Sequence, residues 1–391
     1  MQSPCTSRRS FLKNTGIAAA ASLAGIQVHG QSAQKIEVTD LRTISLQPQY
    51  YIGWPTLTRR TNGDLVVVYS GGREGHVCPF GRVDMMVSHN NGETWQWPQT
   101  LIDGPIDDRD AGVVESAKGT LLVTTFTSLA YEPGLRKMEA QQSEPGAVES
   151  ERLRSWRLVH GRISDAQRKA ELGEWLIRST DGGISWSARV PTIVNSPHGP
   201  TQLSDGRLLY AGKELWTEKQ RIGVAGSLDD GATWKWLAEI PIREGDQVAK
   251  YHELHAVETK GGGIILHIRN ENPNGFGETL QSESSDGGKT WSVPRSIGVW
   301  GLPSFLLKLR DGRLLMTYGH RRAPLGNQAR ISTDDGRTWS DPMIISGDGT
   351  SGDLGYPSTV ELADGTFVTV WYELMKGSKN AVLRQARWRL S

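Results

Sequence analysis

The sequence has few cysteines and no excess of charge of either sign. Its 391 residues include two cysteines, Cys5 and Cys78, and 44 lysines and arginines stand against 43 aspartates and glutamates. Cys5 falls in a predicted targeting segment, so Cys78 keeps no intrachain partner and the fold must be stabilised by packing. No run of like charge occurs, so nothing in the sequence supports binding of nucleic acid or of an anionic membrane.

Long apolar runs and metal-ligand spacings are also missing. No cluster of His, Cys, Asp and Glu has ligand spacing, so we expect no metal and no other cofactor. The apolar run at 15–26 is shorter than the roughly 20 residues of a stable membrane span. It follows the twin arginine Arg8-Arg9, and this order resembles a twin-arginine export signal. We therefore predict a signal peptide over residues 1–33, cleaved near Gly30 or Ala33, and a periplasmic or extracellular location.

Glycine and tryptophan are abundant instead, with 45 and 14 residues. They recur in the pattern Ser-x-Asp-x-Gly-x-Thr/Ser-Trp at 179–186, 227–234, 284–291 and 332–339, and a fifth copy at 88–95 carries Asn90 in place of Asp. Ser and Asp side chains bond nearby backbone amides in turns, and Gly supplies a positive φ. The spacing differs from that of a calcium loop. We interpret these boxes as structural turns.

A second repeat marks paired strands. Six times a turn, in most cases containing Gly, is followed by an apolar strand, at 62–68, 118–123, 205–209, 261–266, 311–315 and 364–368. Glycine in a short turn between apolar runs is a strong hairpin signal. Five of these hairpins precede a box, which predicts an all-β fold, a six-bladed β-propeller of four-stranded antiparallel blades over residues 34–391. A spare strand at 36–46 is expected to close the ring on the last blade.

One segment does not fit the repeat. Residues 129–175 form an insert in the second blade that is rich in charged and amide side chains. Ser164 to Gln167 reads as a capped helix start, so one or two short helices are expected. A lid over the substrate and a solvated excursion both remain open as interpretations.

Strand direction predicts where a site would lie. In each blade the start of the first strand and the end of the second share one face, opposite the glycine turns and the boxes. The polar residues at these positions that we take as candidates are Arg73, His76, Asp108, Arg109, Asp110, His198, His252, Glu253, Arg269, His320, Arg321, Arg322, Tyr356 and Glu373.

From here the chain resembles the sialidase (neuraminidase) superfamily, whose repeated Asp-box matches the boxes. Gly355-Tyr356-Pro357-Ser358 followed by Tyr372-Glu373 is similar to that family's Tyr-Ser segment and terminal Tyr-Glu. The resemblance implies that Tyr356 is the nucleophile, Glu253 its base, and Arg269 and Arg321 or Arg322 members of an arginine triad that binds a substrate carboxylate. Arg73, Arg109, His198, His252, His320 and Glu373 are further candidates for substrate binding.

Two departures from the family pattern are visible. Gly53-Trp54-Pro55 stands where the family has Arg-Ile-Pro, so one triad arginine is missing. No Asp lies at the expected spacing between Arg73 and Ser88. His76 or Glu74, or the cluster at 107–110 with Asp108 and Asp110, would then supply the catalytic acid, and a histidine acid suits neutral pH.

These residues lead to three functional hypotheses with a glycan as the partner. The first is an exported exo-glycosidase of the sialidase type that hydrolyses a terminal sialic acid or another acidic sugar. A tyrosine nucleophile suits it, because a carboxylate nucleophile would be repelled by the substrate carboxylate. The second is a propeller lyase with Tyr and His as acid and base, and the third is a propeller that binds a glycan without catalysis.

Overall fold

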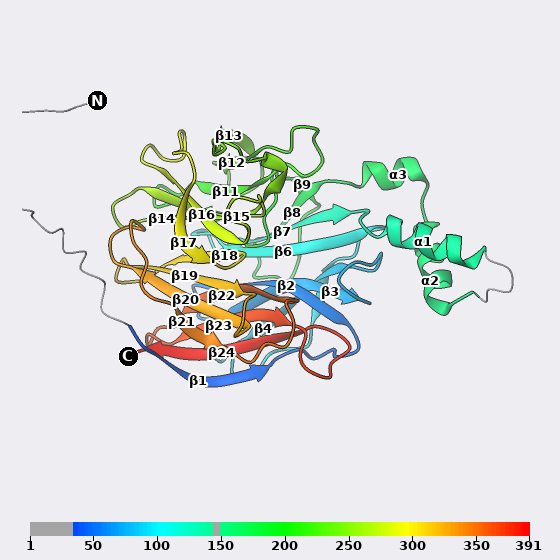
Figure 1. Cartoon of the computed structure of the whole chain (residues 1–391), viewed down its shortest axis with the longest axis horizontal. Helices are drawn as coiled ribbons and strands as arrows, with labels where there is room; N and C mark the ends of the chain where they lie inside the picture. Colours follow the sequence, from blue (N-terminus) through cyan, green and yellow to red (C-terminus); the bar gives the residue numbers. More distant parts are fainter. Residues whose placement is uncertain (1–33, 144–148) are drawn as a thin grey trace, which may run out of the picture. The chain divides into compact units, whose positions relative to one another are not determined.

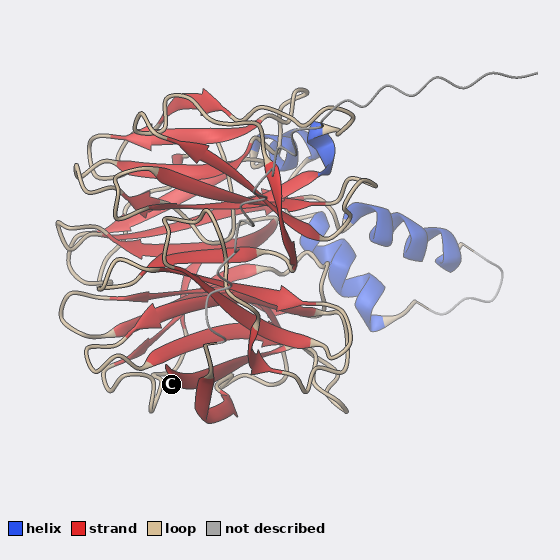
Figure 2. Cartoon of the chain, turned by 60° about the vertical axis from the view of Figure 1, so that its left-hand side comes forward, coloured by secondary structure: helices blue, strands red, loops and turns tan. Residues whose placement is uncertain are grey.

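The structure is a computed structural model that describes residues 34–143 and 149–391. The predicted signal peptide lies outside the described residues. The described strands form six antiparallel sheets of four strands each, and Figures 1 and 2 show them stacked beside one another as blades. The predicted six-bladed β-propeller is confirmed.

Strand bounds are as follows. Blade 1 contains β2 (Tyr51–Arg59), β3 (Leu65–Arg73), β4 (Arg82–Ser88) and β5 (Gln99–Ile102), and blade 2 contains β6 (Asp107–Glu115), β7 (Leu121–Ser128), β8 (Glu174–Ser179) and β9 (Val190–Pro191). Blade 3 contains β10 (Thr201–Gln202), β11 (Leu208–Lys213), β12 (Ile222–Ser227) and β13 (Lys235–Glu239), and blade 4 contains β14 (Tyr251–Glu258), β15 (Ile264–Asn270), β16 (Glu278–Ser284) and β17 (Arg295–Trp300). Blade 5 contains β18 (Ser304–Lys308), β19 (Leu314–His320), β20 (Gly326–Ser332) and β21 (Met343–Ser346), and blade 6 contains β22 (Leu354–Glu361), β23 (Phe367–Glu373), β24 (Val382–Leu390) and β1 (Ile36–Thr43).

The ring is closed by the N-terminal strand. β1 pairs with β24 in antiparallel register, with Ile36 opposite Leu390 and Thr43 opposite Arg384. It is therefore the outermost strand of blade 6, as predicted, and it covers an edge of β24 that would otherwise be open.

Polar contacts join each blade to the next around the ring. Backbone or hydroxyl groups bond across all six junctions, in the pairs Ser70–Asp108, Ala117–Gln202, Ser196–Leu254, His255–Leu306, Arg310–Glu361 and Leu57–Ser358. Between these contacts the blades pack apolar faces, such as the cluster that Leu57, Val67 and Val370 share. Burial of such faces is the main favourable contribution to the fold.

The boxes are self-contained turns. In the box at 284–291, the Gly288 amide donates to the Ser284 hydroxyl at 2.9 Å, and the Thr290 amide and hydroxyl donate to Asp286 at 2.9 and 2.6 Å. Asn90 accepts from the Thr94 amide at 2.9 Å in the same way, so the copy without Asp keeps the turn. The structural interpretation of the boxes agrees with these closed hydrogen-bond sets.

The Asp229 box gives a stability prediction with a defined sign. A hydrogen bond from the Thr233 hydroxyl lowers the pKa of Asp229 from 3.8 to about 2. A carboxyl whose pKa is lowered by folding stabilises the fold above its unfolded pKa and loses that contribution as pH falls through the folded value. The free energy of unfolding of Asp229→Asn should therefore lie below that of the wild type at pH 6, and the gap should close between about pH 4 and 2.

Urea unfolding at a series of pH values measures that gap. Asp341→Asn, at an exposed position outside the boxes, is the matched control and should show a smaller gap. A gap for Asp229→Asn that stays constant down to about pH 2 would contradict the interpretation of this box as a carboxylate-dependent turn.

The insert in blade 2 holds three helices, α1 (Glu132–Gln142), α2 (Glu151–His160) and α3 (Asp165–Ala170), where one or two were expected. Ser164 caps α3 in a full capping box with Gln167, as predicted. Residues 174 and 175 belong to β8 and not to the insert. Figure 2 shows the helices on one side of the strands. None of the helices in the described part of the chain has both the length and the apolar character needed to cross a bilayer.

The insert packs on the loop after β3. Leu135, Leu153 and Trp156 form an apolar cluster with buried Cys78, and the Trp156 indole donates to Glu74 at 2.9 Å. Cys78 is thus a buried free thiol, as expected. The insert therefore supports the loop that carries Glu74, His76 and Cys78.

Candidate active site

The side chains of the site project from irregularities in the innermost strands. The ladder register shifts near Trp54 in β2, Asp110 in β6, Glu253 in β14 and Tyr356 in β22. Trp54, Asp110 and Tyr356 also have positive φ, at 51°, 46° and 55°. Bulges re-aim side chains, and positive φ at bulky residues is strained and concentrates at functional sites. The same kind of irregularity in several blades directs these side chains toward one cavity.

That cavity has a volume of about 360 Å³. Its lining is polar and aromatic and comes from four blades and the start of the insert. The lining residues are Trp54, His76, Arg109, Asp110, Phe126, Ser128, Ala130, His252, Glu253, Arg269, Glu271 and Tyr356. Seven candidate residues from the sequence therefore meet here, namely His76, Arg109, Asp110, His252, Glu253, Arg269 and Tyr356.

Tyr356, Glu253 and Arg269 form a hydrogen-bonded triangle at the base of the cavity. The Tyr356 hydroxyl donates to Glu253 Oε1 at 2.6 Å, and Arg269 Nη1 donates to the Tyr356 oxygen at 3.2 Å and to Glu253 at 2.9 Å. Burial, and then the Glu253 charge, raise the pKa of Tyr356 well above its ordinary value. Burial alone would raise the pKa of Glu253, but Arg269, His252 and the Tyr356 hydroxyl together hold it below its ordinary value. A protonated phenol thus faces an ionised carboxylate that can accept its proton.

Arg269 is held on two sides. Its Nη2 donates to Glu271, and Glu271 also pairs with His252 Nε2 at 3.3 Å. The Arg269 Nε is buried and has no partner among the described residues. Nη1 therefore orients Glu253 and Tyr356, and Nη2 is held by Glu271.

His76 also lines the cavity and belongs to a cluster around Asp353. Asp353 Oδ1 lies 3.2 Å from His76 Nδ1, 3.0 Å from the Tyr51 hydroxyl and 3.1 Å from the Tyr372 hydroxyl. The His76 ring meets Trp54 edge-on at a centroid distance of 4.9 Å. Asp353 engages Nδ1 and so leaves Nε2 as the nitrogen able to exchange a proton with a ligand, as an orienting carboxylate does in other histidine sites.

Asp110 is a buried carboxyl at the edge of the same cavity. It is 8% exposed and its Oδ1 has no hydrogen-bond partner among the described residues. Burial, partly offset by Arg109 and reinforced by the Glu253 charge, raises the pKa of Asp110 to about 6. A carboxyl with this pKa can carry a proton in mildly acidic solution, so Asp110 is a second acid candidate.

The two arginines beside Trp54 differ in availability. Arg109 lies over the indole at 4.6 Å and lines the cavity. Arg73 is fully buried, and its guanidinium donates to Asp107, Ser70 and the Asp108 and His76 carbonyl oxygens. The prediction that Arg73 binds the substrate is therefore wrong, because the donors of Arg73 are occupied in joining blade 1 to blade 2.

Three other interpretations need correction. Asp108 is fully buried and accepts from the Gly104 amide at 2.6 Å, on a side of the strand that does not line the cavity. Glu373 is buried and accepts hydrogen bonds from Arg384 at 3.0 Å and from the Trp371 indole at 2.9 Å. Its role is therefore to stabilise blade 6. Glu74 accepts from the Trp156 indole and does not line the cavity, so it is not placed to act as the acid.

The remaining candidates lie outside the cavity. Arg321 and Arg322 line a neighbouring pocket of about 180 Å³ that shares Arg269 and Glu271 with it, and Arg322 lies 4.0 Å over Trp300. His320 bonds the Pro324 carbonyl oxygen in its own loop at 3.1 Å. His198 is buried below Tyr356, with 6.4 Å between ring centroids, and lines a separate well.

Sequence reasoning missed Asp353 and Glu271 altogether. Asp353 follows a Gly- and Ser-rich loop without a pattern, and its role depends on Tyr51, which is 302 residues away in the chain. Glu271 could have been predicted from the sequence, because it stands two residues after Arg269 and residues at that spacing face the same side of an extended chain. Among residues 34–143 and 149–391, no group of three or more His, Cys, Asp and Glu side chains is placed to hold a metal.

Fold and site together define a propeller of the sialidase and BNR-repeat superfamily. Residues 158–369 match the model of the BNR repeat-like domain family, which is more than half of the chain, so the chain belongs to that family. It is 24% identical over 355 residues to a protein named Sialidase from Bacteroides fragilis, with 82% of this chain and 59% of that protein covered. The chain thus spans about three fifths of that relative's length.

Solved structures share the fold. A crystal structure of a protein of unknown function from Dyadobacter fermentans superposes with a TM-score of 0.73 at 22% identity, covering 91% of this chain and 99% of that one. An intramolecular trans-sialidase from Ruminococcus gnavus, solved with oseltamivir carboxylate, gives a TM-score of 0.62 at 14% identity and covers 88% and 96%. At these identities the likeness concerns the fold, and the chemistry has to be argued from the side chains.

Proposed function

We propose that this protein is an exported exo-glycosidase that hydrolyses a terminal acidic sugar, with Tyr356 as the nucleophile. The observation that carries the proposal is the short Tyr356–Glu253 hydrogen bond of 2.6 Å at the base of a cavity, with Arg269 on the same oxygen. A tyrosine nucleophile needs an adjacent base because its own pKa is far above neutral pH. Glu253 supplies that base.

The first step forms a glycosyl-tyrosine. The Tyr356 oxygen attacks the anomeric carbon, and its proton passes to Glu253. The bond from the anomeric carbon to the leaving-group oxygen breaks, and a general acid protonates that oxygen. Arg269, which donates to the Tyr356 oxygen, stabilises the negative charge that develops on the phenol.

We assign the general acid to His76. By resemblance to the family, the acid should lie between Arg73 and Ser88, and in that stretch His76 is the residue that lines the cavity. Its side chain is 49% exposed, so it can reach a leaving group at the mouth, whereas Asp110 is buried beside Arg109. In the second step the deprotonated His76 takes a proton from water, the water oxygen bonds to the anomeric carbon, and Tyr356 leaves and regains its proton from Glu253.

The cations of the cavity support an acidic substrate. Arg109 faces the cavity and its nearest carboxylate contact, to Asp107, is 3.6 Å long, which leaves the guanidinium able to bind a ligand carboxylate. Arg269 also lines the cavity. Trp54 fills the place of the absent triad arginine with an apolar face. We therefore expect Arg109, Arg269 and the Trp54 indole to recognise the sugar.

Arg109→Gln tests the carboxylate contact. Removing a charge-assisted hydrogen bond is expected to raise KM for the acidic substrate by about 10-fold to 100-fold, with a smaller change in kcat. Steady-state kinetics measures both. Arg322→Gln, at the neighbouring pocket, is the comparison and should change KM less. A KM unchanged in Arg109→Gln would exclude this arginine from substrate recognition.

Product analysis over a substrate panel tests the function itself. Purified protein is incubated with sialosides and with uronides, and the released sugar is identified by mass and by NMR. The expected result is release of one acidic monosaccharide by hydrolysis with net retention at the anomeric carbon. An unsaturated product that absorbs in the near ultraviolet would indicate elimination, and binding without any product would indicate a non-catalytic glycan-binding protein. Either outcome would overturn the proposal.

Export is part of the proposal and rests on the Arg8-Arg9 segment. Fractionation of cells that express the full chain should recover it outside the cytoplasm, and an Arg8→Lys, Arg9→Lys double variant should remain inside. Recovery of both forms in the cytoplasm would remove the export component.

A further inference from the structure

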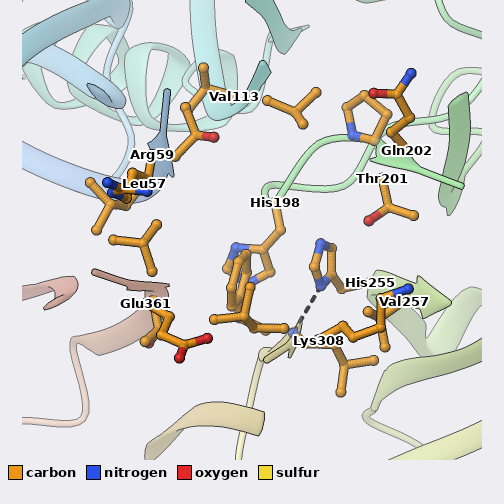
Figure 3. Close-up of a pocket in the computed structure, with 18 of the residues that line it drawn as sticks. Leu57, Arg59, Val113, His198, Thr201, Gln202, His255, Val257, Lys308 and Glu361 are labelled. Atoms are coloured by element: carbon orange, nitrogen blue, oxygen red, sulfur yellow. Dashed lines mark hydrogen bonds between the residues drawn. The ribbon is translucent and has the colours of Figure 1, made fainter. Parts of the chain in front are cut away.

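A second well shares no lining residue with the Tyr356 cavity, and its lining includes His198, whose ring centroid lies 6.4 Å from that of Tyr356. It has a volume of about 400 Å³, within the 300–1,000 Å³ of typical small-molecule sites. All six innermost strands or the residues just before them contribute to it (Figure 3). The parts of the strands that line it lie toward the glycine turns, such as Arg59 at the end of β2 and Glu258 at the end of β14. The well is thus distinct from the Tyr356 cavity.

His198 lies at the base of this well without hydrogen-bond partners. It is 2% exposed, and neither ring nitrogen has a partner among the described residues. Burial lowers the pKa of His198 to about 3, so the ring is neutral and presents one N–H donor and one acceptor nitrogen. Buried polar groups are nearly always satisfied, and an unsatisfied one requires an explanation.

Its neighbour His255 shows the contrast. His255 Nδ1 accepts from the Leu306 amide at 2.9 Å, and the ring stacks on Phe305 at a centroid distance of 4.7 Å. Figure 3 shows both histidines close together in the centre of the lining residues. His255 therefore has a structural role that links blades 4 and 5, whereas neither nitrogen of His198 has a partner among the described residues.

Arg59 supplies an unpaired cation at the rim. Its Nε is buried and has no hydrogen-bond partner among the described residues. The other rim charges are paired, Arg310 with Glu361 at 3.1 Å and Lys308 with Glu258 at 3.5 Å. One positive charge is thus left over, and it favours a ligand with a single negative charge.

The walls between base and rim are mainly apolar. Leu57, Val113, Val257, Leu306 and Val360 line them, together with one aromatic face from Phe305. Such a wall packs the carbon face of a small ring, while a hydroxyl group can both donate to and accept from the neutral imidazole of His198.

We propose that this well binds one acidic monosaccharide, a sugar ring whose hydroxyl pairs with His198 and whose carboxylate pairs with Arg59. The site is independent of Tyr356 chemistry and does not rest on the proposed function. Two sources of the same chemistry, a hexuronic acid and a sialic acid, are separated by the experiment.

Calorimetric titration of the full chain tests the proposal. Glucuronate and N-acetylneuraminate are the two probes, and glucose is the neutral control. At least one acidic probe is expected to bind, with glucose at least tenfold weaker. Arg59→Gln should weaken binding tenfold or more, and so should His198→Phe. Arg313→Gln, which changes an arginine outside the lining of the well, should leave the Kd within about twofold.

Turnover and a second variant keep this site apart from the catalytic one. Arg109→Gln, in the Tyr356 cavity, should leave the Arg59-dependent binding intact, and Arg59→Gln should keep wild-type turnover. Absence of heat with both acidic probes would overturn the proposal. Binding that is unchanged in Arg59→Gln, or lost only in Arg109→Gln, would overturn it as well, because the sugar would then occupy the other cavity.

Discussion

Replacing Tyr356 with phenylalanine is expected to lower kcat/KM by about 10³-fold or more, a loss of roughly 4 kcal/mol of transition-state stabilisation. The substitution removes the single oxygen that would bond to the anomeric carbon and leaves the ring in place. The ring is 4% exposed and packs against Tyr372 at 5.7 Å, so the fold should be retained. Steady-state kinetics with the best substrate of the panel measures the effect.

Tyr318→Phe is the matched control. Tyr318 is also a buried tyrosine, its hydroxyl bonds Gln328 and Arg330, and it does not line the cavity. Loss of that hydroxyl is expected to cost stability of about 1 kcal/mol and to leave turnover close to wild type. If Tyr356→Phe kept full turnover while remaining folded, the phenol would not be the nucleophile.

Replacing His76 with alanine is expected to produce a loss that depends on the leaving group. A general acid contributes about 10²-fold to 10⁴-fold when the leaving group needs a proton. Sugars linked to another sugar need it, whereas a nitrophenyl leaving group does not. His76→Ala should therefore lose most of its activity on natural linkages and much less on nitrophenyl glycosides. Parallel kinetics on the two substrate types measures the ratio.

Asp110→Asn and Asp353→Asn sharpen this test. Asp353 acts as a positioning residue that holds His76 Nδ1 at 3.2 Å, so Asp353→Asn should share the leaving-group dependence of His76→Ala and should alter the pH profile of turnover. If Asp110→Asn alone showed the leaving-group dependence, the acid would be Asp110.

The fold was accessible from the sequence because its turns are local. Glycine turns and boxes are specified by residues within eight positions of each other, and five boxes and six hairpins repeat them along the chain. The closure of the ring by residues 36–43 could be predicted because the sequence has one spare strand at its start and one incomplete blade at its end. The number of helices in the insert was underestimated because residues 129–175 carry no repeat and because Cys78, which packs against them, lies in another blade.

The site was accessible only in part because burial depends on distant partners. Arg73 and Arg109 occupy similar rim positions in the sequence, and Asp107 from the next blade decides that Arg73 is buried and Arg109 faces the cavity. Glu373 does not line the cavity, because it pairs with Arg384 of its own blade. Strand direction placed seven candidates correctly on one face, but the direction in which a side chain points depends on bulges, as at Asp110 and Tyr356.

The charge state of Glu253 depends in part on groups that are distant from it in the sequence. Burial by itself would raise the pKa of Glu253. Arg269, His252 and the Tyr356 hydroxyl reverse that direction. The ionised form that can accept the phenolic proton therefore results from groups contributed by β14, β15 and β22 together.

The most direct test of the central claim is to trap the covalent intermediate. A fluorinated acidic glycosyl fluoride, chosen from the sugar that the panel identifies, forms a glycosyl-enzyme that hydrolyses slowly, and peptide mass spectrometry locates the adduct. We expect one sugar on the phenolic oxygen of Tyr356 and no adduct in Tyr356→Phe. An adduct on another residue, or turnover with inversion and no adduct, would contradict it.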